Sequence, residues 1–474
     1  MSVSIVEKAT FGHDFARLDA EYVEHDSLAH EQRVRAKFDG AQLATLVAPV
    51  DSDDRKVKAA FQNSNKAIRY LAIDGVDTDD GLSFDTAFDA FEELPSRAQY
   101  LVQPGDILVS NVRPNRGAVA LVRADQAGFV ASSGFTLLRL ADNAAVSSDY
   151  LFALLKTPFM RDQLVRRSRG SMYPAVVRSD VLDLFVPMPD PVVAKKVSEC
   201  MARARQLQAE FFHKKATSRA MLGSLLGEIG SPPSPLETKR AGVDWTEVDA
   251  NSMFRAGGAE RLDAEFFRSE YFEFDARCKA TGNTFVLGDY FELSPGRALA
   301  ASADTTFYAK QGILTNVGVN WAAIEESEGR LAKGAWKLRK GDILLACTAH
   351  EIAYVGKRVD VISEIPMWVG EEVGCVPDLM IIRPKPTGSN YLSLQYVAAF
   401  LRSPSGLHQV QRCIRGLRGG HVYKDDLERF VRVPLPEEAW MREFDAVETE
   451  AELIRNEAKQ IVASAVSRVS DMLR

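Results

Sequence analysis

Apolar residues recur every three or four positions along two long stretches of the chain, and this spacing predicts two long amphipathic helices. The first stretch runs from Pro191 to about Gly230, and the second from Glu437 to Arg474. Alternating spacings of three and four describe a coiled-coil seam, so we expect an antiparallel helical pair; packing of each helix on its own domain is the alternative. The seam residues are Val193, Val197, Cys200, Ala204, Leu207, Phe211, Leu222, Leu225 and Ile229, then Trp440, Phe444, Val447, Ala451, Ile454, Ala458, Ile461, Ala465, Val469 and Met472.

A mixture of short strands, turns and helices precedes each long helix, which is typical of a mixed α/β domain. Each mixture contains a strand with the sequence Gly-Asp-Ile-Leu and, further on, an apolar helix. A proline two residues beyond each apolar helix closes it, because proline cannot continue a helix. The apolar helices are expected at Tyr150–Lys156 and Tyr396–Arg402, and their prolines are Pro158 and Pro404.

The two halves of the chain carry the same motifs in the same order, separated by between about 236 and 247 residues. A period this long indicates a duplicated domain, since solenoids repeat at about 20–50 residues. Two similar modules suit a ligand with two similar halves, and duplex DNA is the commonest such ligand. The matching segments are Arg17–Tyr22 with Arg261–Phe266, Gly105–Leu108 with Gly341–Leu344, Arg169–Gly170 with Arg415–Gly416, and Val186–Pro189 with Val433–Pro436.

A proline-rich stretch, Gly230–Pro235, interrupts the first long helix about midway along the chain, where a duplication would place a linker. The pattern therefore predicts two α/β recognition modules joined by two long antiparallel helices. We expect five segments: module 1 at 1–190, a central helix at 191–230, a linker at 231–244, module 2 at 245–436 and a C-terminal helix at 437–474.

Composition limits the classes of protein that this chain can belong to. With 474 residues and 46% hydrophobic residues, the chain can form two cores. Its net charge of −7 argues against a surface that is basic throughout, but DNA binding depends on local charge density. No apolar run approaches the roughly 20 residues that span a membrane. The 5 cysteines include no metal-ligand spacing, and the start of the chain is not signal-like, so we expect a metal-free cytoplasmic protein.

Sequence motifs of catalysis are absent, which predicts a protein that is not an enzyme and needs no cofactor. There is no phosphate loop, no glycine-rich dinucleotide or methyl-donor turn, no GxSxG elbow and no HExxH. The carboxylate pairs Asp19/Glu21 and Asp263/Glu265 could serve as metal ligands or bases. We favour a role in packing for them, and an enzyme with an unrecognised site remains an alternative.

Two basic, glycine-containing segments at equivalent places are the strongest candidates for DNA contact. Arginine suits both phosphate oxygens and the O6/N7 edge of guanine, and glycine allows close backbone approach. A solvated basic turn is the alternative interpretation. The first segment, expected to be a loop from Arg161 to Tyr173, supplies Arg166, Arg167, Arg169, Ser171 and Tyr173, with Arg178 beyond it; the second supplies Arg412, Arg415, Arg418, His421, Tyr423 and Lys424.

A second candidate surface follows each Gly-Asp-Ile-Leu strand. In the first module it is rich in groups that can hydrogen-bond to base edges, and in the second module the residues differ sharply. This difference fits two modules that read different sequences, and it also fits drift in an unimportant turn. The candidates are Ser110, Asn111, Arg113, Asn115 and Arg116 in the first module, and Thr348 and His350 in the second.

The duplicated set of RLDAE(Y/F), GDIL, the Arg-Gly segment and the Pro-x-Pro element before a long helix resembles the specificity subunits of Type I restriction-modification enzymes. The resemblance covers nearly the whole chain. It implies two target-recognition domains that each read one half of a split site in double-stranded DNA. It also implies two antiparallel helices that fix their separation and dock two DNA-methyltransferase subunits, which a translocase-nuclease subunit can join. By position, Ser110–Arg116, Thr348–His350, Arg166–Tyr173 and Arg412–Lys424 would face DNA.

We therefore interpret the chain as a non-catalytic DNA-recognition subunit. Two alternatives stay open. A methylation-only or phage-defence complex related to Type I systems could use the same subunit architecture. A coiled-coil scaffold that binds only proteins is the alternative from another class, and salt-dependent binding to a bipartite duplex would separate it from the DNA-binding interpretation.

Overall fold

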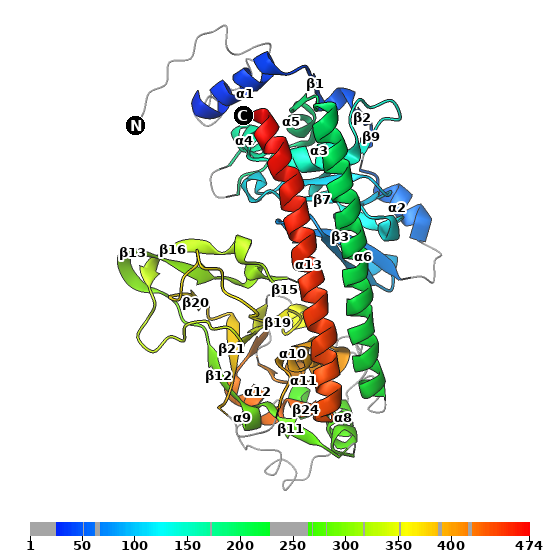
Figure 1. Cartoon of the computed structure of the whole chain (residues 1–474). Helices are drawn as coiled ribbons and strands as arrows, with labels where there is room; N and C mark the ends of the chain where they lie inside the picture. Colours follow the sequence, from blue (N-terminus) through cyan, green and yellow to red (C-terminus); the bar gives the residue numbers. More distant parts are fainter. Residues whose placement is uncertain are drawn as a thin grey trace. The chain divides into compact units, whose positions relative to one another are not determined.

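The computed structural model describes residues 25–50, 52–61, 67–170, 173–227, 264–267, 269–280, 282–315, 318–349, 352–386, 391–415 and 420–474 (Figure 1). The first RLDAE motif, the linker, Ser171, His350 and Arg418 lie outside these residues. The chain divides into two compact units. The first contains the described residues up to Phe211 together with Leu453–Arg474, and the second runs from Phe212 to Glu452.

The first unit contains two four-stranded sheets, one ordered β2-β9-β6-β7 and the other β4-β3-β8-β5, and a two-stranded pair β1-β10. Its pairs are antiparallel except β3 with β8. The strands are β1 (Gly40–Gln42), β2 (Val47–Ala48), β3 (Ile68–Val76), β4 (Ser83–Phe88), β5 (Ala98–Leu101), β6 (Ile107–Ser110), β7 (Val119–Leu121), β8 (Val130–Ser132), β9 (Phe135–Leu140) and β10 (Phe185–Pro187). The α-helices before the long helix are α1 (His25–Lys37), α2 (Asp54–Phe61), α3 (Ser148–Leu155), α4 (Pro158–Arg167) and α5 (Arg178–Leu182).

The second unit repeats the main elements of the first. Its sheets are ordered β12-β21-β17-β19, β16-β13-β20 and β18-β23-β22, with the pairs β11-β24 and β14-β15. The strands are β11 (Thr284–Val286), β12 (Phe291–Pro295), β13 (Ala300–Ala309), β14 (Leu314–Thr315), β15 (Gly318–Val319), β16 (Glu325–Arg330), β17 (Ile343–Ala346), β18 (Thr348–Ala349), β19 (Val359–Val361), β20 (Gly374–Cys375), β21 (Leu379–Pro384), β22 (Ile414–Arg415), β23 (Gly420–Val422) and β24 (Arg432–Pro434). The helices are α8 (Ser269–Ala280), α9 (Leu287–Tyr290), α10 (Leu394–Arg402), α11 (Pro404–Arg412) and α12 (Lys424–Phe430).

The repeated motifs make the same contacts in both units, which confirms the duplicated, mixed α/β fold class. The buried aspartate of each Gly-Asp-Ile-Leu motif forms a bidentate ion pair with an arginine of a neighbouring strand, Asp106 with Arg139 and Asp342 with Arg383. A buried tyrosine of α3 or α10 donates a hydrogen bond to the first proline of the Pro-x-Pro element. The Tyr150 hydroxyl lies 2.8 Å from the Pro187 carbonyl oxygen, and the Tyr396 hydroxyl 2.7 Å from that of Pro434.

Pro158 and Pro404 do more than close the apolar helices. Each occupies the first position of a further helix, α4 or α11, where its missing N–H costs nothing. The preceding hydroxyl residues, Thr157 and Ser403, cap these helices by accepting a backbone N–H. The residues expected to begin a basic loop at Arg161 are therefore helical as far as Arg167, and that part of the prediction is wrong.

The two long helices, α6 (Pro191–Gly227) and α13 (Glu438–Leu473), run antiparallel within each unit (Figure 1). In the first unit, Arg203 of α6 pairs with Glu457 of α13 at 3.0 Å. In the second unit, Lys214 of α6 pairs with Glu450 at 2.7 Å, and Lys215 with the buried Glu448. None of the described helices is long and apolar enough to cross a membrane.

The buried seam follows the predicted spacing but drifts by one residue in several places. Met201 is buried where Cys200 was predicted, Val462 where Ile461 was predicted, and Met441 where Trp440 was predicted. An α-helix has 3.6 residues per turn, so a seam extrapolated at 3.5 residues per turn shifts gradually around a straight helix. Ile229 lies outside the described residues.

A buried group of charges attaches α13 to the turn between β3 and β4 in the first unit. Arg455 pairs with Asp77 at 2.5 Å, and Lys459 lies 3.0 Å from Asp77 and 3.0 Å from Asp79. Lys156, which directly follows α3, donates to the Thr78 carbonyl oxygen. Buried charges are tolerated only when they are paired, so this turn and α13 constrain each other.

Asp80 in the same turn gives stability a distinct pH dependence. Burial raises the pKa of Asp80 to about 6, and the neighbouring Asp77 carboxylate adds to this effect. Because the folded-state pKa lies above its ordinary value, ionising Asp80 weakens the fold as pH rises through about 6. We expect Asp80→Asn, which resembles the protonated acid, to be more stable than the wild type near pH 8, by at most about 3 kcal/mol.

Urea denaturation of both proteins near pH 8 and near pH 5 measures this difference. It should be about half as large near pH 5, because the folded-state carboxyl is then mostly protonated while the unfolded-state carboxyl, with its ordinary pKa of 3.8, is still mostly ionised. An advantage of Asp80→Asn that is equal at both pH values would contradict this account.

Candidate nucleic-acid interface

In the first unit, the segment after β6 and the segment after α4 are joined by backbone hydrogen bonds. Isolated bridges pair Val112 with Ala175 and Arg169 with Ala175. The Arg113 N–H donates to the Pro174 carbonyl oxygen at 2.7 Å, and the Val176 N–H donates to the Asn111 carbonyl oxygen at 2.9 Å. The two sequence-predicted surfaces of this module therefore form one site.

The residues of this site have different roles. Ser110 is buried, and its hydroxyl donates to the Val112 carbonyl oxygen, while the Asn111 side chain accepts from Thr136 at 2.6 Å. These two side chains support the turn. Asn115 and Arg116 are exposed, and Tyr173 is 66% exposed. The part of the site that can meet a ligand is therefore the turn from Arg113 to Arg116 together with Tyr173.

The second unit builds the equivalent site as the three-stranded sheet β18-β23-β22. Thr348 pairs with His421, and Arg415 also pairs with His421 on the other side. The Val422 N–H donates to the Cys347 carbonyl oxygen at 2.9 Å, as Val176 does to Asn111 in the first unit. The same backbone arrangement thus carries different side chains in the two units.

The side chains of the second site form a connected group. The Thr348 hydroxyl and His421 Nδ1 lie 2.5 Å apart, and the His421 and Tyr423 rings make an edge contact with centroids 4.5 Å apart. The Arg415 guanidinium carbon lies 5.5 Å from the centre of the Tyr423 ring, within the range of a cation–π contact. Tyr423 and Lys424 are exposed, so they are accessible to a partner.

The arginine of each Arg-Gly motif is paired with an aspartate at the same spacing. Arg169 pairs with Asp180 at 2.6 Å, and Arg415 with Asp426 at 2.8 Å, with a second hydrogen bond in each case. These bidentate pairs fasten the segment to α5 or α12. Sequence analysis missed the two aspartates, although the repeated spacing from arginine to aspartate was a signal that could have found them.

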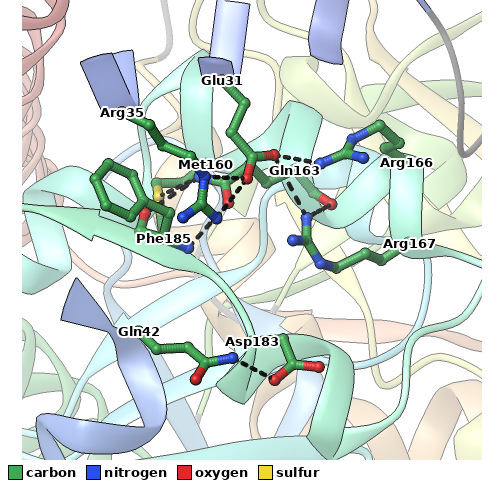
Figure 2. Close-up of polar contacts among 9 residues, drawn as sticks. All are labelled: Glu31, Arg35, Gln42, Met160, Gln163, Arg166, Arg167, Asp183 and Phe185. Atoms are coloured by element: carbon green, nitrogen blue, oxygen red, sulfur yellow. Dashed lines mark hydrogen bonds and ion pairs between the residues drawn. The ribbon is translucent and has the colours of Figure 1, made fainter. Parts of the chain in front are cut away.

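Arg166 and Arg167, which were expected to face DNA, point into the first unit (Figure 2). Arg166 is 4% exposed and pairs with Glu31 of α1, and Arg167 lies 3.9 Å from the same carboxylate. Arg35 also donates to Glu31. From these positions the two arginines cannot reach a phosphate. No motif pointed to Glu31, because it lies far from them in the sequence.

Arg412 is the counterpart of Arg166 and is also buried. Its guanidinium lies over the Phe266, Phe272 and Phe430 rings, 4.3, 4.9 and 5.8 Å from their centres, and its Nε donates to the Phe266 carbonyl oxygen. Phe266 is the last residue of the second RLDAEF motif, and this residue packs against Arg412. The expectation that Arg412 faces DNA is revised in the same way as for Arg166.

The remaining predicted residues are placed as follows. Arg178 begins α5 and is half-buried, and Lys424 begins α12 and pairs with Asp425 at 3.3 Å. Ser171, His350 and Arg418 lie outside the described residues. The exposed set is thus smaller than the predicted one because tertiary packing buries three of its arginines.

Three buried cysteines are not activated as nucleophiles. Burial raises the pKa of the Cys278, Cys347 and Cys375 thiols to about 12, so they remain protonated at neutral pH. Among the same residues no group of three or more His, Cys, Asp or Glu side chains is arranged to hold a metal ion. The exposed polar and basic surface is suited to binding.

Part of the chain is similar in sequence to a known protein. The chain is 28% identical, over 108 residues, to the specificity subunit of the Type I restriction enzyme HindI from Haemophilus influenzae. The match covers 22% of this chain and 23% of that relative, so it spans about a quarter of either protein. No protein-family model matches the chain.

Two solved structures are similar over most of their length. The HsdS subunit from Thermoanaerobacter tengcongensis is 17% identical, with 91% of this chain and 95% of that one covered and a TM-score of 0.32. The S subunit of a Type I restriction-modification system from M. genitalium is 12% identical, with 92% and 94% covered and a TM-score of 0.35. The sequence match to the HindI subunit confirms the resemblance to Type I specificity subunits that the duplicated motifs indicated.

Proposed function

We propose that this chain is the DNA-recognition subunit of a Type I restriction-modification complex and reads a bipartite site in double-stranded DNA. The observation that carries the proposal is the duplication of one accessible surface. Two units with the same backbone scaffold each present an exposed tyrosine beside an arginine, Tyr173 with Arg113 and Tyr423 with Arg415. Arginine and hydroxyl-bearing side chains such as tyrosine can contact the phosphates of DNA and the base edges in its grooves.

In this proposal the chain itself is non-catalytic and needs no cofactor. Residues 1–190 and 245–436 form the two target-recognition domains, 231–244 is the linker, and the helices in 191–230 and 437–474 set the distance between half-sites. The exposed faces of those helices dock two DNA-methyltransferase subunits, and translocase-nuclease subunits can join the complex. The buried Arg166, Arg167 and Arg412 position the two surfaces without touching DNA.

The test is salt-dependent binding of the complex of this chain with its methyltransferase to a bipartite duplex. Arg116→Ala and Lys424→Ala each remove an exposed cation from one of the two surfaces. If each contacts a phosphate, the log–log salt slope should fall by roughly one unit per substitution. Arg55→Ala on the exposed face of α2 removes the same charge away from the turn and should leave the slope unchanged.

Whether the two units read their half-sites independently can be tested separately. Exchanging residues 1–190 for the corresponding region of a related subunit should alter one half of the recognised site and leave the other intact, because each unit has its own core. The DNA-recognition proposal would be rejected if Arg116→Ala and Lys424→Ala left the salt slope unaltered and the complex preferred no duplex sequence. That result would favour the protein-binding scaffold.

A further inference from the structure

Arg113 has an unusual backbone conformation. Its φ of 51° lies in the left-handed region, and it is the one non-glycine residue with positive φ in the described part of the chain. A side chain in that region is strained, so the conformation persists only where the surroundings impose it. Here the Arg113 N–H donates to Pro174, the Arg116 N–H donates back to the Arg113 carbonyl oxygen at 2.9 Å, and Pro114 follows.

The side chain of Arg113 is oriented by an aromatic ring. Its guanidinium carbon lies 5.2 Å from the centre of the Tyr173 ring, which is largely exposed. Within the described residues the guanidinium makes no hydrogen bond or ion pair, in contrast to Arg169, which is held by Asp180. The five N–H donors of Arg113 are thus presented beside the exposed ring, on a backbone that cannot easily turn away.

This arrangement suits a base edge better than a phosphate. A phosphate is bound well by any flexible cation, and such contacts carry no sequence information. Arg113 has a fixed backbone, and its guanidinium lies beside an aromatic ring. The planar fork of N–H donors is therefore held in a restricted orientation. The base edge that matches this fork is the O6/N7 pair of guanine, which accepts two parallel hydrogen bonds in the major groove.

The described residues of the second unit do not repeat this arginine–tyrosine group at the equivalent turn. The bridge between Val112 and Ala175 in the first unit corresponds to the bridge between Thr348 and His421 in the second. Ala349 therefore occupies the position that corresponds to Arg113. The accessible group there is built from Arg415 of β22, His421 of β23 and Tyr423, which follows β23. The two units therefore present different donors on one scaffold, as two modules with different half-sites require.

We propose that Arg113 reads a guanine in the half-site recognised by the first unit, and that the second unit makes no equivalent contact. This inference rests on the proposed function and deepens it. Arg113 becomes a specificity-determining residue, with Tyr173 as the residue that orients it. Asn111 and Ser110 act only through the turn that they support.

The experiment selects bound sequences from a duplex library in which both half-sites are randomised, using the complex of the full chain with its methyltransferase. Two variants are compared with the wild type. Arg113→Lys keeps the charge and removes the fork. Arg113→Gly removes the side chain and suits a positive φ, so it is expected to fold. Arg55→Lys on α2 is the matched control.

We expect wild-type selection to fix at least one guanine in one half-site. Both Arg113 variants should reduce the preference for that guanine by roughly 10- to 100-fold, while all other positions and the other half-site are unchanged. The inference is overturned if the variants weaken binding equally for every sequence, since that identifies a phosphate contact. It is also overturned if the altered preference is not for a guanine.

The same selection distinguishes a failure of the proposed function from a failure of the role of Arg113. A wild-type complex that selects no sequence rejects the proposed function, and the role of Arg113 falls with it. A wild-type complex that selects a bipartite site, with Arg113→Gly selecting the same site equally well, rejects only the role of Arg113.

Discussion

Replacing Glu31 with glutamine is expected to destabilise the first unit by about 3–5 kcal/mol. The Glu31 carboxylate is buried and lies against Arg166 and Arg167, two arginines that are also buried (Figure 2). Glutamine keeps the size of the side chain but removes its charge. The two buried guanidinium groups would then lose the attraction of this carboxylate, and removing one member of a buried ion pair is far more costly than the intact pair is favourable.

The pKa of Glu31 gives the same prediction a pH dependence. Burial raises this pKa, but Arg166, Arg167 and Arg35 together outweigh burial and hold it below its ordinary value of 4.5. The carboxylate therefore contributes stability that is fully present above about pH 4.5 and is lost as pH falls through the lowered pKa. The advantage of the wild type over Glu31→Gln should shrink in the same acidic range.

Urea denaturation at neutral and acidic pH measures both effects. Glu199→Gln, on an exposed position of α6, makes the same chemical change outside the cluster and should alter stability by less than about 0.5 kcal/mol. A Glu31→Gln protein as stable as the wild type at neutral pH would show that Arg166 and Arg167 have other adequate partners.

Phe159→Ala should cost the first unit about 3–5 kcal/mol, because it removes a large ring from a close-packed core. Phe159 is 4% exposed, and it belongs to the same core as Val469 and Leu473 of α13. Its ring also makes an edge contact with His30, with centroids 5.3 Å apart. The substitution should therefore loosen both α1 and the end of α13.

The second unit supplies a natural comparison for this position. Ser405 stands where Phe159 stands in the first unit, since each follows the proline that begins α4 or α11. A hollow of about 510 Å³ lies beside Ser405 and is lined also by Leu222, Leu226 and Phe444. Ser405 is thus a small side chain on the wall of a space that a larger side chain could occupy.

Ser405→Phe is the reciprocal test. It should stabilise the second unit by about 1–3 kcal/mol, because the new ring buries apolar surface against Leu222 and Leu226. Denaturation followed by separate probes of the two units should show opposite shifts for Phe159→Ala and Ser405→Phe. A loss of stability in both variants would mean that the second hollow does not accept an aromatic ring.

The sequence predicted the architecture because its signals are local and occur twice. The spacing of apolar residues in α6 and α13 depends on helix geometry alone, and the tyrosines of α3 and α10 recur at matching places. Proline and the hydroxyl residues before it marked the helix ends for similarly local reasons. A repeated pattern of this kind is difficult to produce by chance, and it indicated both the duplication and the antiparallel pair.

Which basic residues are accessible was decided by tertiary structure alone. Arg166 and Arg169 lie three residues apart in one basic segment, yet the first is enclosed by α1 and the second is on the surface. The partner that buries Arg166 is Glu31, which is distant in sequence and belongs to no motif. Local sequence fixes the type of side chain, whereas the packing of remote elements determines the direction in which it points.

The sequence by itself thus determined the duplication, the mixed α/β class, the two long helices and the two segments from which the proposed binding surface is built. Tertiary structure decided which members of those segments form the surface, and it added Glu31, Asp180 and Asp426, which hold the arginines in place. It also placed Arg113 in a left-handed turn beside Tyr173. The physical reason is that backbone periodicity is encoded locally, while burial and charge pairing depend on residues brought together only when the chain folds.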